Sequence, residues 1–277
     1  MLLLGHRGCR GEFTENTFAA FDHAIGCGCD GFELDVRLSA DAIPVVWHDA
    51  RVRGSSIARH TFGSLRERCC GPTASCLSNP LKPTAGLNGP PGQMQVDVGH
   101  QPTQAKPRLE WATRPRVPRR EAIDLRQLEE VLARYAQVGW MDIELKVRGA
   151  EAQVVELLRR YRPARGFAVS SFRRAVLLEL RRIDPSLPLA FIFDRMPREK
   201  TWRELPIQFV KPSARLVTPA RVRQFHAAGM KVLTWTVNRP TAMCRLSEAG
   251  VDGMIGDDPA ALAASRFQSF KVSKPQG

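Results

Sequence analysis

The sequence predicts an α/β fold, a (β/α)₈ TIM barrel with an extra hairpin strand and a proline-rich insertion after that strand. Short apolar segments alternate with segments of helical periodicity along most of the 277 residues, a pattern typical of a parallel sheet. Eight such apolar segments can be counted, the number that a closed barrel requires. The glycine-rich phosphate turn of a dinucleotide fold is absent from the sequence, which disfavours the alternative, an open doubly wound sheet.

The first fifty residues predict two barrel strands, one helix and a hairpin. An apolar strand covers 2–5, and a helix begins near Thr17 with apolar residues at helical spacing. A second strand covers 31–37, and a short turn joins it to a third apolar run at 43–47. Because that third run returns along the second strand, we do not count it among the barrel strands.

After residue 120, strands and helices alternate in sequence. The six remaining barrel strands are expected at 141–145, 167–170, 189–193, 207–211, 232–236 and 253–255. The helices are expected at 124–138, 150–161, 172–183, 197–204, 218–228, 240–248 and 258–264.

One segment interrupts this alternation. Residues 69–118 are rich in proline, lack periodicity and carry few large aliphatic side chains. Such a segment buries too little apolar surface to offset the entropy lost on ordering. We therefore expect one barrel domain over 1–277, in which 69–118 is a loop or a disordered insertion.

The net charge of +13 is concentrated in one part of the chain. Residues 51–120 contain twelve Lys and Arg against three acidic residues, so they supply +9 of the total. A basic segment on a nearly neutral domain is a weaker sign of nucleic-acid binding than a basic groove. We expect a small-molecule substrate and no nucleic-acid partner, and a polyanion-binding protein that uses this segment is kept as an alternative.

The apolar and cysteine patterns indicate a cytoplasmic protein. The sequence shows neither a signal peptide nor an apolar stretch near the ~20 residues of a transmembrane helix. Seven cysteines occur without paired CxxC motifs, which argues against a structural zinc site and for reduced thiols.

Acidic residues lie at alternate positions on two predicted barrel strands. Glu33 and Asp35 share one face of their strand, and Glu144 shares a face with Lys146. Carboxylates that converge at one barrel mouth need protons or a cation. Oxygen ligands favour Mg²⁺ or Ca²⁺. The alternative is that each acid pairs with an arginine.

Two histidines follow predicted strands at the end where barrel active sites form. His6 and His48 suit proton transfer near neutral pH. Arg7 is positioned to bind a phosphate oxygen, and Lys146 can act on it as a point charge.

Together these residues form a series of motifs that resembles the glycerophosphodiester phosphodiesterase family. The resemblance covers nearly all of the chain outside 50–120, and its specificity comes from the order and spacing of the motifs. The motifs include His6-Arg7-Gly8, Glu15-Asn16-Thr17, Glu33-Leu34-Asp35-Val36, Pro44-Val45-Val46-Trp47-His48-Asp49, Ile143-Glu144-Leu145-Lys146, Ser170-Ser171-Phe172, Trp235-Thr236-Val237-Asn238 and Gly250-Val251-Asp252-Gly253.

This resemblance implies metal-dependent hydrolysis of glycerophosphodiesters to glycerol 3-phosphate and an alcohol, with Mg²⁺ or Ca²⁺ as the cofactor. It assigns metal binding to Glu33, Asp35 and Glu144, general acid and base catalysis to His6 and His48, phosphate binding to Arg7 and Lys146, and a place in the substrate pocket to Trp235.

The chain departs from the family pattern in the predicted hairpin and after it. Ala42 stands where the family usually has glycine, which removes a residue that adopts positive φ easily. Residues 50–120 differ most, in the region that shapes the substrate pocket in the family. A lysophospholipase D-type hydrolase of lipid head groups on the same barrel is therefore an alternative.

Overall fold

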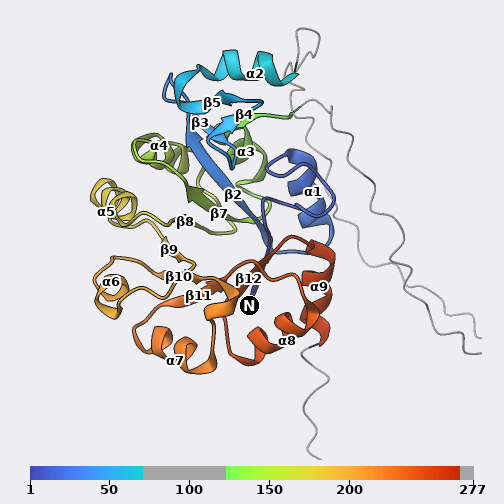
Figure 1. The fold of residues 1–277 in the computed structure, drawn as a ribbon, viewed down its shortest axis with the longest axis vertical. Coiled ribbons are helices and arrows are strands. Elements are labelled where there is room, and N and C mark those ends of the chain that lie inside the picture. Colours follow the sequence, from blue (N-terminus) through green and yellow to red (C-terminus); the bar gives the residue numbers. More distant parts are fainter. Residues whose placement is uncertain (71–122, 269–277) are drawn as a thin grey trace, which may run out of the picture.

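The first barrel strand pairs with both the second and the last, so the sheet closes into a ring. This is seen in a computed structural model that describes residues 1–70 and 123–268 (Figure 1). Neighbouring strands of the ring are parallel, and the predicted eight-stranded barrel is confirmed. In ring order the strands are β1 (Leu2–Gly5), β2 (Gly31–Leu38), β7 (Trp140–Leu145), β8 (Phe167–Ser171), β9 (Leu189–Phe193), β10 (Phe209–Pro212), β11 (Lys231–Thr234) and β12 (Gly253–Gly256).

Helices surround the ring and cover its outer face (Figure 1). The side chain of Thr17 accepts a hydrogen bond from the backbone of Ala20 and so caps the first helix. The helices around the ring are α1 (Phe18–Gly26), α3 (Leu128–Tyr135), α4 (Glu151–Tyr161), α5 (Arg174–Ile183), α6 (Glu199–Arg203), α7 (Pro219–Ala227), α8 (Pro240–Glu248) and α9 (Pro259–Gln268).

The predicted faces of β2 are confirmed. Phe32, Leu34 and Val36 are fully buried in the core between the sheet and the helices. The ring of Phe32 stacks on Phe21 of α1, with 4.1 Å between the ring centroids. Because side chains alternate along a strand, the acidic residues between these apolar residues point into the barrel.

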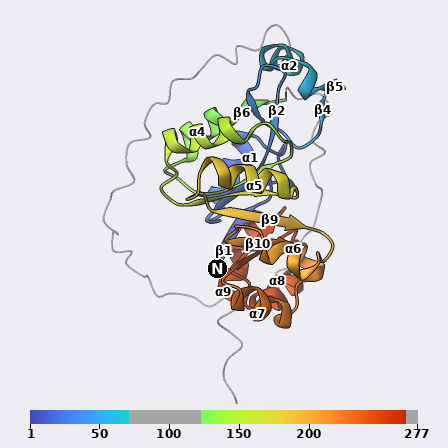
Figure 2. The same cartoon turned by 90° about the vertical axis from the view of Figure 1, so that its left-hand side faces the viewer.

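A smaller unit extends from one end of the barrel, and the sequence analysis did not predict most of it. It contains β3 (Pro44–Val46), β4 (Arg51–Val52), β5 (Ser55–Ser56) and α2 (Phe62–Cys70), which lie together in both views (Figures 1 and 2). This unit has its own core, formed by Val45, Val52, Ile57, Phe62, Leu65, Cys69 and Leu125.

Two predicted boundaries need correction here. The expected helix 124–138 is α3, which begins only at Leu128 because β6 (Arg126–Gln127) first pairs with β3. Within the expected loop 69–118, residues 69 and 70 belong to α2. The rest of that segment, which includes five of the twelve Lys and Arg residues of 51–120, lies outside the described residues.

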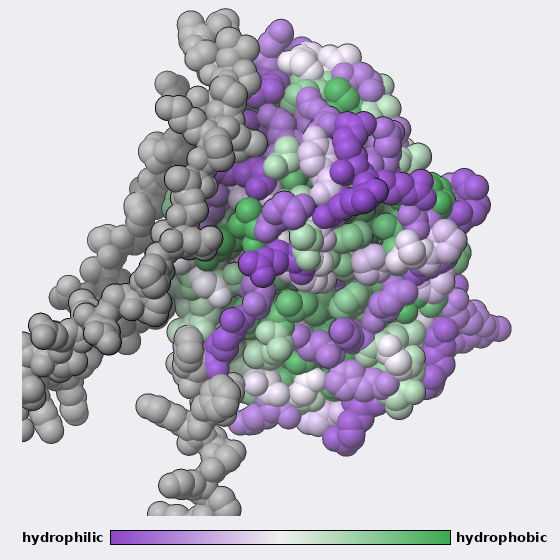
Figure 3. Space-filling view, turned by 180° about the vertical axis from the view of Figure 1, so that it is seen from behind, coloured by the Kyte–Doolittle hydropathy of each residue, from purple (hydrophilic) through white to green (hydrophobic). Residues whose placement is uncertain are grey.

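The outer surface mixes polar and apolar side chains. Seen from behind, hydrophobic residues lie between hydrophilic ones in the middle of the molecule, and hydrophilic residues dominate the right-hand edge (Figure 3). None of the helices in the described ranges combines the length and apolar character needed to cross a membrane.

Candidate active site

The predicted acidic residues meet inside the barrel because β2 and β7 are neighbours in register. Asp35 is paired with Glu144, and Glu33 with Asp142. The carboxyl ends of parallel strands share one end of a barrel, so His6, which follows β1, reaches the same region.

A cavity of about 160 Å³ opens at this end of the barrel. Seven of the eight site residues predicted from the sequence line it, and the eighth, Asp35, is buried beside them. The lining residues are His6, Arg7, Glu33, His48, Glu144, Lys146, Phe172, Ile192, Lys211, Trp235 and Ile255. A cavity of similar size, about 170 Å³, lies outside the ring between the β2–β3 turn and α4 and contains none of the predicted site residues.

Three buried carboxylates form the acidic centre of the cavity. One oxygen from each of Glu33, Asp35 and Glu144 lies within 4.8 Å of the others. Burial and the neighbouring Asp35 raise the pKa of Glu33 well above its usual value. The buried Oδ1 atom of Asp35 has no hydrogen-bond donor in good geometry among the described residues, although Nζ of Lys146 lies 3.3 Å away. Three hard oxygen ligands, one of which lacks a hydrogen bond, fit a bound Mg²⁺ or Ca²⁺.

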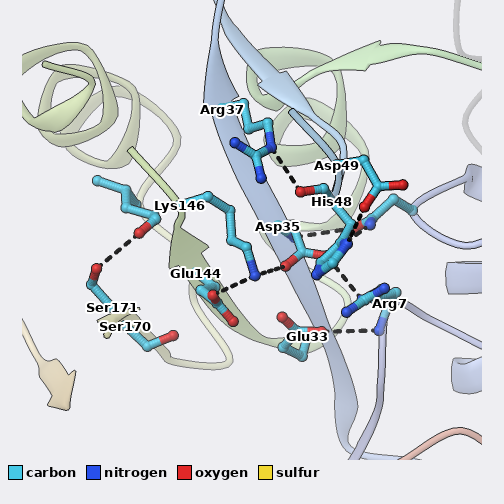
Figure 4. A network of polar contacts seen from close by, with 12 residues as sticks. Arg7, Glu33, Asp35, Arg37, His48, Asp49, Glu144, Lys146, Ser170 and Ser171 are labelled. Atoms are coloured by element: carbon cyan, nitrogen blue, oxygen red, sulfur yellow. Dashed lines mark hydrogen bonds and ion pairs between the residues drawn. The ribbon is translucent and has the colours of Figure 1, made fainter. Parts of the chain in front are cut away.

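Lys146 lies between two of these acids (Figure 4). Its Nζ atom is 2.7 Å from Oε1 of Glu144 and 3.3 Å from Oδ1 of Asp35. Burial opposes the ionisation of Asp35, but Lys146 and Arg7 more than compensate and lower the pKa of that carboxyl. Lys146 therefore neutralises part of the acidic charge.

Arg7 is held by contacts on several sides. Its backbone N–H donates to Glu33 Oε2 at 3.0 Å, and its Nε atom is 3.0 Å from Oδ2 of Asp35. Its Nη1 atom contacts both carboxylate oxygens of Glu15 at 2.9 Å. Arg7 has a φ of 51°, and Gly8 follows it, where a Cβ atom would lie 2.5 Å from the backbone of Ala20. This close approach explains the glycine of the His-Arg-Gly motif.

Each predicted catalytic histidine is paired with an aspartate through Nδ1. His6 Nδ1 lies 2.6 Å from Oδ1 of Asp257, and His48 Nδ1 lies 2.8 Å from Oδ1 of Asp49. Burial opposes the ionisation of Asp257, but hydrogen bonds with His6 and Asn238 lower its pKa. An ionised Asp257 accepts the hydrogen bond, so the ring donates from Nδ1 and Nε2 is left for proton exchange.

The two pairs differ in exposure. The His6 side chain is 10% exposed and lies deep in the site, with Nε2 at 3.9 Å from Oε2 of Glu33. The His48 side chain is 31% exposed, and its partner Asp49 is 71% exposed. The His6 ring is therefore held in a drier environment than the His48 ring.

A buried cation in the wall of the cavity was not among the site residues predicted from the sequence. Lys211 is fully buried, forms an ion pair with Asp142, and its Nζ atom lies 3.1 Å from Oγ of Ser170. Burial opposes its charge, but Asp142 and Glu33 more than compensate and raise the pKa of the lysine. The sequence did contain an indication of this ion pair. Asp142 lies two residues before Glu144 on β7, so strand alternation places it on the same face, inside the barrel.

Trp235 lies just beyond β11 and forms an apolar wall of the cavity. Its Nε1 atom donates to the backbone oxygen of Lys211 at 2.9 Å. Its ring meets Phe172 edge to face, with 5.6 Å between centroids. The predicted strand 232–236 ends at Thr234, so Trp235 lies in the loop after the strand.

Comparisons with known proteins identify the family of the chain and agree with its fold. The family model for the glycerophosphoryl diester phosphodiesterase family matches residues 6–261. A glycerophosphodiester phosphodiesterase from Caldanaerobacter subterraneus is 27% identical over 269 residues, covering 94% of this chain and 96% of the relative.

Two solved structures share the fold. A glycerophosphodiester phosphodiesterase from Thermotoga maritima has a TM-score of 0.68 at 22% identity, covering 95% of this chain and 97% of its own. A phosphodiesterase from Oleispira antarctica, in complex with the product sn-glycerol-3-phosphate, has a TM-score of 0.70 at 20% identity, covering 96% and 97%. Because the family model spans nearly the whole chain, the protein belongs to the glycerophosphoryl diester phosphodiesterase family.

Proposed function

We propose that this protein hydrolyses glycerophosphodiesters to glycerol 3-phosphate and an alcohol, using a divalent cation and two histidines. The observation that carries the proposal is the meeting, in one cavity, of three buried carboxylates with two histidines that are each paired to an aspartate. Membership of the family and the product bound to the Oleispira antarctica phosphodiesterase support the same reaction class.

Glu33, Asp35 and Glu144 are the residues that would hold the cation, Mg²⁺ or Ca²⁺. When bound, such an ion offsets negative charge that develops on the phosphate oxygens.

Arg7 and Lys146 bind and orient the phosphate. Both carry their positive charge close to the acidic centre and both line the cavity. Because Arg7 is already bonded to Glu15 and Asp35, its orientation is preorganised and costs little when the substrate binds. Trp235 and Phe172 supply an apolar wall against which the carbon chain of the substrate packs.

The two histidines exchange protons with the substrate through Nε2. In the first step one removes the proton from the attacking hydroxyl, which we take to be the glycerol hydroxyl of the substrate itself, and the other protonates the oxygen of the leaving alcohol. The cyclic phosphate so formed is opened to glycerol 3-phosphate by water, with the two histidines in exchanged roles. Asp257 and Asp49 hold the rings through Nδ1.

The test is a product assay on the full chain. We expect release of glycerol 3-phosphate from glycerophosphocholine in the presence of Mg²⁺ or Ca²⁺, and loss of the activity in EDTA. His6→Ala and His48→Ala should each lower kcat by about 10²–10⁴-fold, the usual contribution of a general acid or base.

His226 provides a matched control. It also pairs with an aspartate, with Nε2 at 2.8 Å from Oδ2 of Asp252, but does not line the cavity. His226→Ala should keep full activity. If His6→Ala and His48→Ala also stay fully active while circular dichroism shows native folding, the assignment is wrong. Hydrolysis of lysophosphatidylcholine in place of glycerophosphocholine would instead identify a head-group hydrolase.

A further inference from the structure

A second group of metal-ligand side chains lies between β1 and α1, separate from the three acids. Cys9, Glu12 and His23 each offer one ligand atom within 4.8 Å of the others. A fourth candidate is adjacent, because Sγ of Cys27 lies 3.3 Å from Nε2 of His23. The same Nε2 atom lies 3.6 Å from Oε2 of Glu12, so a thiol and a carboxylate both approach one imidazole nitrogen.

The local structure brings these side chains together. His23 and Cys27 are four residues apart at the end of α1, and this spacing places them on one face of the helix. Cys9 and Glu12 come from a tight turn in the preceding loop, where the N–H of Phe13 donates to the oxygen of Cys9 at 3.1 Å. The Phe13 ring packs on the His23 ring, with 4.8 Å between centroids, and restricts its orientation.

We propose that Cys9, Glu12, His23 and Cys27 form a binding site for a thiophilic divalent cation of the zinc type. Two sulfurs, one imidazole nitrogen and one carboxylate oxygen are a donor set that suits Zn²⁺ and does not suit Mg²⁺ or Ca²⁺. A histidine that serves only in packing needs a single polar partner, whereas this one is approached by a thiol and a carboxylate. The CxxC pattern is absent because a loop and a helix supply two ligands each.

The site has a structural consequence for the barrel mouth. Sγ of Cys9 lies 3.9 Å from the backbone oxygen of Asp257, the residue that holds the His6 ring. Cys9 also follows Arg7 by two residues in the same loop. A cation at this position therefore fastens the loop that carries Arg7 to α1, next to the His6–Asp257 pair.

Cobalt is a probe that distinguishes this site from the acidic centre. Co²⁺ bound to thiolates gives a sulfur-to-metal charge-transfer absorption, and the three carboxylates of the acidic centre contain no sulfur. We expect the metal-free full chain to develop this band when Co²⁺ is added under reducing conditions, and to lose it when Zn²⁺ is added.

Substitutions then assign the ligands. Cys9→Ser and Cys27→Ser should each lower the intensity of the band because each removes one of the two thiolates, and the double variant Cys9→Ser/Cys27→Ser should abolish it. His23→Gln should weaken Co²⁺ binding. Glu12→Gln should weaken Co²⁺ binding, and because Glu12 is exposed this variant keeps its fold. Two control variants, Cys244→Ser at an exposed position and the double variant Cys70→Ser/Cys76→Ser, should leave the band unchanged.

The cobalt titrations can contradict the proposed site in several ways. No charge-transfer band in the native protein overturns the proposal, as does a band that survives in Cys9→Ser/Cys27→Ser. A band that Cys27→Ser leaves at full intensity excludes the four-ligand site. Zn²⁺ should also raise the Tm of Glu33→Gln, whose acidic centre is impaired, but not that of a Cys9→Ser/Glu33→Gln double variant.

Discussion

At the scale of single residues, the acidic centre holds two neighbouring carboxylates in opposite electrostatic states. Glu33 is disfavoured as an anion because it is buried and faces Asp35. Asp35 is favoured as an anion because Lys146 and Arg7 outweigh the cost of its burial. Only one residue, Leu34, separates them along β2. The buried pair of carboxylates lowers the stability of the folded protein, and such a cost is typical of residues that serve function.

The opposite states of Glu33 and Asp35 should give opposite effects when each is replaced by its amide. In EDTA near pH 7, Glu33→Gln should raise the free energy of unfolding by roughly 0.5–2 kcal/mol, since it removes a carboxylate whose charge the fold disfavours. Because folding raises the pKa of Glu33, this carboxyl destabilises the folded protein fully at pH values above its pKa in the folded state. The destabilisation is absent at pH values below its pKa in the unfolded chain. The gain should therefore shrink as the pH falls through the raised pKa of Glu33. Urea titration at several pH values measures it.

Asp35→Asn is the matched comparison and should behave in the opposite way. Its lowered pKa stabilises the folded state above the unfolded pKa, and that stability is lost as the pH falls through the folded value. The variant should be less stable than the native protein near pH 7. Equal stabilisation by both substitutions would show that the two carboxylates are not in different states.

Residue patterns predicted one part of the site and missed another. Alternation along a strand was enough to place Glu33, Asp35, Glu144 and Lys146, because their relation is local in the sequence. The partner of His6 is not local, since Asp257 is 251 residues away. Only closure of the ring brings these two together, and no pattern within one segment encodes that contact.

At the scale of elements, the eight barrel strands and their helices were predictable because each buries an alternating or periodic apolar face. The unit formed by β4, β5 and α2 was not, because its strands have two residues each. Two residues show no periodicity. Their stability comes from packing with Val45, Phe62 and Leu65 in a separate core, which involves side chains from several segments.

The β2–β3 turn offers an element-scale prediction. Ala42 has a φ of 59°, a conformation that costs an L-residue about 1–2 kcal/mol. The family pattern usually has glycine at this position, and glycine adopts positive φ without that cost. Ala42→Gly should relieve that strain and stabilise the protein by about 0.5–1 kcal/mol after the larger entropy of the unfolded glycine is subtracted. Thermal and urea unfolding measure the change.

Ala40 in the same turn is the control. It is exposed and is not among the described residues with positive φ. Ala40→Gly gains nothing in the folded state and adds freedom to the unfolded chain, so it should destabilise the protein. The same sign of change for both variants would contradict the strain at Ala42.

At the scale of the whole molecule, the ring makes distant parts of the chain depend on each other. β1 has β2 on one side and β12 on the other. Helix α9 adds to this closure, with Arg266 Nη2 at 2.5 Å from Oδ2 of Asp30, which also accepts from the backbone N–H of Leu3 at 2.8 Å. Neither half of the chain can complete the sheet alone.

The described barrel should therefore unfold as one unit, as the single domain expected from the sequence requires. Scanning calorimetry should show one transition whose calorimetric and van't Hoff enthalpies agree. Two resolved transitions would show instead that part of the chain, such as the unit around α2, forms an independent domain.

The contact between His6 and Asp257 also has a consequence for biosynthesis. A chain emerging from the ribosome presents His6, Arg7 and the three acids long before residue 257 is made. Until then the His6 ring lacks the aspartate that orients it, and β1 lacks one of its two neighbours. The nascent chain thus carries most of the site without being able to assemble it, and the oriented His6 ring is acquired only after residue 257 has been synthesised.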